Sequence, residues 1–75
     1  MQVIFLGPEV RFSVRVTEEG CTRLPQGAFS PGTNVPAYAM RIEGERDDTH
    51  TYFLLPAADG HFHWVPMSDL YLARR

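Results

Sequence analysis

The residues best suited to metal chemistry are two histidines near the end of the chain. His61 and His63 lie two positions apart in a segment with strand character, so both side chains leave the same face. Zinc prefers such imidazole ligands, but two ligands are fewer than a zinc site needs. His50 is expected on the opposite face, and only a twofold dimer would bring four histidines together. We therefore expect no metal and no other cofactor.

A second kind of chemistry would involve the lone thiol or paired carboxylates. Cys21 is the only cysteine, which excludes an internal disulfide and a cysteine-rich zinc site. A thiol becomes a nucleophile when a histidine serves as its base, but no third group is placed to orient such a pair. The carboxylate pairs at 18–19 and 47–48 flank turns, where solvated side chains are expected. There is no glycine motif for phosphate, so the sequence favours a protein that is not an enzyme.

Composition and charge narrow the class of partner. The chain has 75 residues, of which 44% are hydrophobic and 21% charged, as in one small globular domain over 1–75. A net charge of -2 gives no basic footprint, so weak nucleic-acid binding through Arg11, Arg15 and Arg41 ranks below protein binding. The apolar opening at 1–6 is too short for a signal peptide or a membrane span. We expect a bacterial cytoplasmic protein with no membrane contact.

Any such site must be positioned by strands, because period-two alternation dominates the chain. The apolar residues between Val10 and Val16 alternate with polar ones, which is typical of a strand with one buried face. The prolines lie between the alternating runs, where their missing amide donors do least harm. We predict strands over 1–6, 10–17, 38–43, 49–55, 61–65 and 70–73 and no helix of two or more turns within 49–65.

Two connections predict a three-stranded antiparallel meander. If the turn at 44–48 places Glu43 opposite Thr49, and the turn at 56–60 places Leu55 opposite His61, both registers select the same buried face. That face carries Tyr38, Met40, Ile42, Tyr52, Leu54, Phe62 and Trp64. The opposite face carries Ala37, Ala39, Phe53, Leu55, His61, His63 and Val65, and it is more apolar than a solvated face should be. This face is therefore expected either to be covered by another part of the chain or to be a contact surface.

The segment 18–36 has no periodicity and contains three glycines and three prolines. Connections of this length without regular structure are often binding loops or mobile segments. Its apolar residues Leu24, Phe29 and Val35 predict that part of the loop packs onto the sheet.

The closing run Trp-Val-Pro-Met-Ser-Asp-Leu-Tyr-Leu at 64–72 resembles the last segment of SH3-like barrels. In that family a strand ends in proline, a short 3₁₀ turn follows, and an aromatic or aliphatic pair opens the final strand. The resemblance implies an all-β fold, a small five- or six-stranded partly open barrel with a central meander and one long early loop. The Ala-Leu-Tyr-Asp-Tyr motif of the peptide-binding branch is absent, so recognition of proline-rich peptides is not implied.

These patterns lead to a non-enzymatic interaction module that binds a partner protein or a second copy of itself. The residues expected to contact the partner are Phe29, Phe53, Leu55, His61 and His63. The alternatives are an oligomeric barrel that binds a small molecule in a shared cavity and a weak nucleic-acid-binding barrel. Type II dihydrofolate reductases resemble the chain in length and strand order, but their Val-Gln-Ile-Tyr pore motif is absent.

Overall fold

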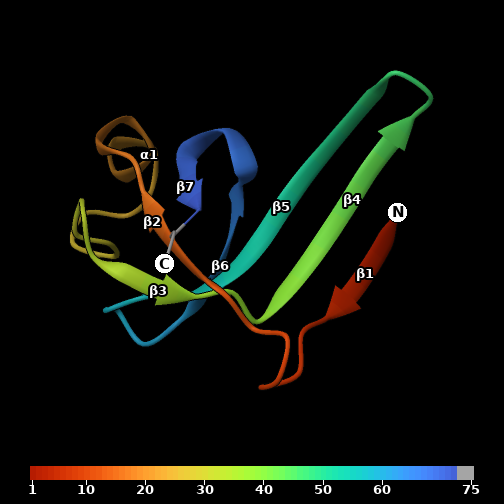
Figure 1. Cartoon of the computed structure of the whole chain (residues 1–75). Helices are drawn as coiled ribbons and strands as arrows, with labels where there is room; N and C mark the ends of the chain where they lie inside the picture. Colours follow the sequence, from red (N-terminus) through yellow and green to blue (C-terminus); the bar gives the residue numbers. More distant parts are fainter. Residues whose placement is uncertain (73–75) are drawn as a thin grey trace.

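The structure is a computed structural model that describes residues 1–72, and it is built mostly of antiparallel β-strands (Figure 1). The elements, in chain order, are β1 (Gln2–Phe5), β2 (Ser13–Val16), α1 (Glu18–Arg23), β3 (Asn34–Pro36), β4 (Ala39–Glu45), β5 (Asp48–Pro56), β6 (Phe62–Pro66), the 3₁₀ turn η1 (Met67–Asp69) and β7 (Leu70–Leu72). The all-β prediction is confirmed, and each of the six predicted strands is present at least in part. Ala73, the predicted end of the last strand, lies outside the described residues.

The strands form two sheets that do not close into one barrel within residues 1–72. A four-stranded sheet has the order β1-β4-β5-β6, and a three-stranded sheet has the order β3-β2-β7. Figure 1 shows that the β4–β5 hairpin, with β1 beside it, extends beyond the small sheet. No helix in residues 1–72 is long and apolar enough to cross a membrane.

The predicted meander exists, but its first register differs by one residue. Glu43 lies opposite His50 rather than Thr49, because the turn contains only Arg46 and Asp47. Gly44 (φ +106°) and Arg46 (φ +53°) adopt left-handed conformations there, which lets the ladder continue to the tip of the hairpin. A shift of one residue turns every side chain of one strand to the other face relative to its partner.

The second register differs by two residues, which leaves the faces of β5 and β6 in step. Leu55 lies opposite His63 rather than His61, and Leu54 lies opposite Trp64. The turn between these strands has five residues, as predicted, but it is displaced by one residue, to 57–61. Because a shift of two preserves the side-chain alternation, only the alignment along the strands changes.

The core lies on the face that the sequence assigned to the outside. Phe53, Leu55 and Val65 are at most 5% exposed and pack against Val14 and Val16 of the second sheet. The expected core residues Tyr38, Ile42, Tyr52, Leu54 and Trp64 are half-buried, and Phe62 is 53% exposed. The face prediction is wrong because β2, with the loop that follows it, covers the opposite side of the meander. Met40 alone of the predicted set packs against the core, since the shifted register places it opposite Phe53.

The segment 18–36 is not a structureless loop, because it contains α1 and β3. The Thr17 hydroxyl caps α1 by accepting a hydrogen bond from the Gly20 backbone N–H at 2.9 Å. Glu18 and Glu19 lie in the first turn, where negative charge favours a helix. The packing prediction for this segment is confirmed: Phe29 is buried in the core, and Leu24 and Val35 pack against it.

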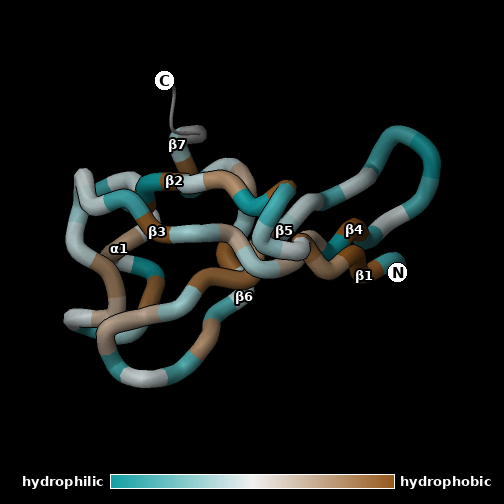
Figure 2. Tube along the Cα trace, turned by 60° about the horizontal axis from the view of Figure 1, so that its bottom comes forward, coloured by the Kyte–Doolittle hydropathy of each residue, from teal (hydrophilic) through white to brown (hydrophobic). Residues whose placement is uncertain are grey.

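The closing segment follows the predicted order of strand, short turn and last strand. Pro66 precedes η1, and β7 then pairs antiparallel with β2. The turn is joined to α1 through Asp69, whose carbonyl accepts from the Thr17 N–H at 2.8 Å and whose buried carboxylate pairs with Arg23. Figure 2 shows that the tip of the β4–β5 hairpin is hydrophilic, whereas β1 and the adjoining part of β4 are hydrophobic.

Candidate functional site

The candidate site is the face of the four-stranded sheet turned away from the second sheet, which we call the outer face. Directly paired residues share a face of a sheet, so the strand registers define its members. One row across the sheet is Phe5, Ala39, Leu54 and Trp64, and the next is Val3, Arg41 and Tyr52. Phe62, two residues before Trp64 on β6, belongs to the same face.

Arg41 covers the aromatic rings at the centre of the outer face. Its guanidinium carbon lies 4.5 Å from the ring centre of Tyr52 and 4.9 Å from that of Trp64. A guanidinium over aromatic rings is held by their negative faces. Its charge is partly compensated by Glu43, at 3.5 Å from Nη2, while its buried Nε has no hydrogen-bond partner within residues 1–72. Arg41 is therefore a fixed part of this surface rather than a free cation.

A groove of about 370 Å³ opens at the end of the outer face where β1 terminates. Its walls are largely apolar and include Phe5, Tyr38, Leu54 and Phe62. Phe5 is 79% exposed and Phe62 53%, which are high values for phenylalanine side chains. The rings of Tyr38 and Phe62 meet edge to face at 5.3 Å between centroids. We call this feature the outer-face groove.

Arg11 is the one charged residue among residues 1–72 that lines the outer-face groove. Its Nε donates to the Leu6 carbonyl at 3.2 Å, and its guanidinium carbon lies 4.1 Å above the ring centre of Tyr38. Arg11 forms no salt bridge within residues 1–72, in contrast to Arg23 and Arg41. The groove thus combines apolar walls with an uncompensated and positioned cation.

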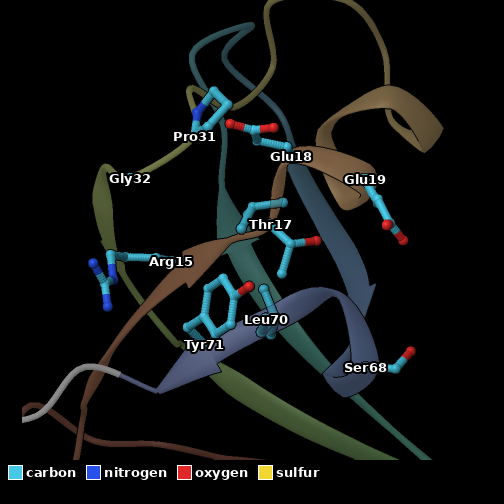
Figure 3. Close-up of a pocket in the computed structure, with 10 residues that line it drawn as sticks. Arg15, Thr17, Glu18, Glu19, Pro31, Gly32, Ser68, Leu70 and Tyr71 are labelled. Carbon is cyan, nitrogen blue, oxygen red and sulfur yellow. The ribbon is translucent and has the colours of Figure 1, made fainter.

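A second, larger groove of about 710 Å³ lies over β2, the start of α1 and β7 (Figure 3). Its lining is mainly polar, and Figure 3 shows that the side chains of Arg15, Glu19 and Ser68 diverge rather than converge. The Thr17 hydroxyl is already engaged in capping α1. A binding site for a small molecule needs polar groups aimed at a common point, so this groove ranks below the outer face.

The residues predicted to contact a partner do not form one surface. Phe29, Phe53 and Leu55 are 9%, 5% and 0% exposed and belong to the core, so a partner cannot reach them at the surface of this structure. His61 is exposed, and His63 is half-buried with its ring edge to face against Phe29. The sheet face that carries Phe53 and Leu55 was predicted to contact a partner, but it is buried because β2 and the segment after it cover it.

The two histidines are engaged by a carboxylate in the β5–β6 turn. His63 Nε2 lies 2.9 Å from Asp59 Oδ2, and the His61 backbone N–H donates to Asp59 Oδ1 at 3.0 Å. Among residues 1–72 there is no group of three or more histidine, cysteine, aspartate or glutamate side chains able to hold a metal ion. The contacts of His61 and His63 with Asp59 therefore order the β5–β6 turn locally.

The hydrogen bonds to Asp59 make the stability of this turn depend on pH. The His61 N–H, and to a lesser degree the His63 side chain, lower the pKa of Asp59 below its usual value. The ionised carboxylate thus contributes stability above the unfolded pKa of about 3.9, and this is lost as pH falls through the lower folded pKa. We expect Asp59→Ala to reduce the free energy of unfolding near pH 7 and to have a smaller effect at pH values below the unfolded pKa of about 3.9, as measured by urea titrations. An equal loss at both pH values would contradict this role.

Cys21 has the properties of an inert thiol. It is half-buried and packs against the core, and burial raises its pKa, with a smaller contribution from the charge of Glu18. A raised pKa keeps the thiol protonated at neutral pH, whereas a nucleophile must be a thiolate. The structure thus offers no activation of Cys21 within the described part of the chain.

Sequence reasoning missed the outer-face groove, including Phe5, Arg11 and the exposure of Tyr38 and Phe62. A usable signal was Gly44 next to a short polar turn, since a two-residue hairpin would have placed Arg41 opposite Tyr52.

Searches among protein-family models, curated proteins and solved structures find no match to this chain.

Proposed function

We propose that this protein is a non-enzymatic interaction module that binds a partner protein through its outer face. The observation that carries the proposal is the pair of exposed phenylalanines, Phe5 and Phe62, beside half-buried Tyr52 and Trp64 on one sheet and half-buried Tyr38 just before β4. Phenylalanine, tyrosine, tryptophan and arginine are the residues enriched at protein interfaces and among their energetic hot spots. A domain of this size gains much from covering such a surface, because its own core is small.

The arrangement of arginines favours a protein partner over single-stranded nucleic acid. Nucleic-acid binding by small β-domains uses free aromatic faces on which bases stack. Here the guanidinium of Arg41 lies over Tyr52 and Trp64, and that of Arg11 over Tyr38. A base would have to displace these cations first, and the net charge of -2 provides no compensating attraction.

The classification as an SH3-like domain is part of this proposal. It is supported by the order of the meander β4–β5–β6, the turn η1 and the closing strand β7 beside β2. Small β-domains of that class serve many different functions, so the classification does not identify the partner. The proposed partner binding depends on the outer face and not on this classification.

A matched pair of aromatic substitutions tests the proposed surface. Phe62 on the outer face and Tyr71 on the second sheet are 53% and 59% exposed. A partner is first identified by cross-linking in the source cells, and the complex is then reconstituted from purified proteins. We expect Phe62→Glu to weaken binding at least about 30-fold and Tyr71→Glu to change it less than about threefold, as measured by calorimetry.

The binding footprint provides the decisive control. Amide chemical shifts of the labelled protein should change in β1, β5 and β6 when the purified partner is added. A complex whose footprint lies on β2 and β7, or whose affinity is insensitive to Phe62→Glu in a folded variant, would overturn the proposed function. Binding of a second copy of this chain through the outer face would agree with the proposed function, with the chain itself as the partner protein.

A further inference from the structure

The outer-face groove differs from a plain apolar patch because Arg11 is held beside it in a defined orientation. One contact fixes the guanidinium edge, through Nε and the Leu6 carbonyl at 3.2 Å. A second holds its central carbon over the Tyr38 ring, 4.1 Å from the ring centre. Tyr38 is in turn held by its edge contact with Phe62 at 5.3 Å. A preorganised side chain loses less entropy when a ligand binds, so this geometry suits recognition.

The charge of Arg11 is available to a ligand. Within residues 1–72 no carboxylate forms a salt bridge with it, and its one hydrogen bond to the chain uses Nε. The two terminal nitrogens of a guanidinium form a planar fork that matches the two oxygens of a carboxylate. Apolar walls beside such a fork reduce the local dielectric and strengthen the pairing. The ligand chemistry indicated is a carboxylate joined to an apolar group.

The openness of the groove favours a carboxylate at the end of a polypeptide over the carboxylate of a small molecule. Sites for small molecules bury about 70–90% of the ligand surface. Here the two phenylalanine walls remain 79% and 53% exposed, and the outer face continues beyond them across β1, β4 and β5 with Val3, Arg41 and Tyr52. The volume of about 370 Å³ is within the range of small-molecule sites, so the exposure of the walls is the observation that favours one side chain at the end of a longer polypeptide.

We propose that the outer-face groove binds the C-terminus of a partner protein whose last residue is apolar. The terminal carboxylate pairs with the guanidinium of Arg11, and the last side chain packs against Phe5, Leu54 and Phe62. The preceding residues of the partner cross the remaining outer face. This inference rests on the proposed function, because it specifies the chemistry of the partner at the same surface.

Three probes distinguish a peptide C-terminus from other ligands. The first is N-acetyl-Gly-Ser-Gly-Leu with a free carboxylate, the second is the same peptide as its C-terminal amide, and the third is 4-methylpentanoate. The last compound has the leucine side chain and a carboxylate without the peptide. Each is titrated into the full labelled chain to about 5 mM while amide chemical shifts are recorded, since weak binding in the millimolar range is measurable in this way.

We expect the free acid to shift amides around Phe5, Tyr38 and Phe62, and the amide to bind at least about tenfold more weakly. 4-Methylpentanoate should also bind more weakly than the peptide acid, because it lacks the residues that continue over the face. In Arg11→Gln the difference between acid and amide should disappear. Arg15→Gln is the matched control, since Arg15 also lies over a tyrosine, Tyr71, but belongs to the second sheet.

Each other outcome decides against the inference. If the acid and the amide bound equally at the outer face, the groove would not recognise a carboxylate. If 4-methylpentanoate bound as tightly as the peptide acid, the groove would be a site for small molecules. Absence of shifts up to about 5 mM would also overturn the C-terminus proposal. The comparison of acid with amide on the unmodified chain holds even if Arg11→Gln fails to fold. The proposed function is tested separately, because it fails only if a folded Phe62→Glu variant binds the partner protein as tightly as the unmodified chain or if the binding footprint lies on β2 and β7.

Discussion

Replacing Leu55 with alanine is expected to cost about 2–5 kcal/mol of unfolding free energy, which is most of the stability of a domain this small. Leu55 has no exposed surface, and it packs between the two sheets with Val14 and Val65. Removing its branched side chain leaves a cavity that the surrounding strands cannot fill without losing their registers. Urea unfolding followed by circular dichroism measures the loss.

The neighbouring leucine is the matched control for this prediction. Leu54 has the same side chain but points to the opposite face, where it is half-buried in the outer-face groove. We expect Leu54→Ala to cost less than about 1.5 kcal/mol, because part of its surface is already solvated. If Leu54→Ala were more damaging than Leu55→Ala, the assignment of the faces would be wrong.

Gly20→Ala is the second substitution with a large expected effect, although alanine has a higher helix propensity than glycine. Gly20 is buried in α1, and a Cβ atom there would lie 2.7 Å from Asp69 Cβ and 3.0 Å from Val16 Cγ1. Both neighbours belong to packed elements, so the extra methyl group must displace α1 or η1. We expect a loss of about 1–3 kcal/mol, larger than the gain of at most about 1 kcal/mol from helix propensity.

Gly7→Ala controls for the general effect of adding a methyl group. A Cβ atom at Gly7 meets no other atom within 4 Å, and its backbone has no positive φ. The substitution should therefore be neutral or slightly stabilising, by up to about 1 kcal/mol through the unfolded state. Thermal melts of the two variants test the pair, and equal stability of Gly20→Ala and the unmodified protein would show that α1 does not pack closely on Asp69.

The strands were predictable because their signal is local. Alternation requires only the pleat of a strand, and the prolines and glycines mark where strands end. The strand predicted over 10–17 is confirmed only in part, because β2 begins at Ser13 and Val10 is 63% exposed. The helix α1 was missed because Gly20 interrupts any helical pattern, and only the cap by Thr17 before two glutamates signals it. The helix exists for a tertiary reason, since only a glycine lets it approach Asp69.

The choice of the buried face was not available from local patterns, because both faces of the meander are apolar. Phe53 and Leu55 on one side and Tyr52 and Leu54 on the other are similar in hydrophobicity. The outcome depends on which side β2 and the loop with Phe29 cover, and this is a contact between distant parts of the chain. The one-residue difference in the β4–β5 register depends on left-handed conformations at Gly44 and Arg46.

The same long-range contacts explain why the candidate site could not be predicted. Arg11 lies far in sequence from Tyr38 and Phe62, and the three meet only because β1 pairs with β4 and the chain turns back after Leu6. Phe53 and Leu55 were expected at a surface because they form an apolar patch with Ala37, Ala39 and Val65. That patch is buried within the chain, and the aromatic residues of the outer face are left partly exposed.

The exposure of the outer face in the free protein is tested most directly by the methyl groups of two adjacent leucines. A soluble paramagnetic complex added to the protein with labelled leucine methyl groups increases their relaxation in proportion to solvent access. The account predicts strong relaxation for Leu54, which lines the outer-face groove, and almost none for Leu55, which is fully buried. Relaxation at Leu55 with protection at Leu54 would contradict the fold and would remove the proposed binding surface with it.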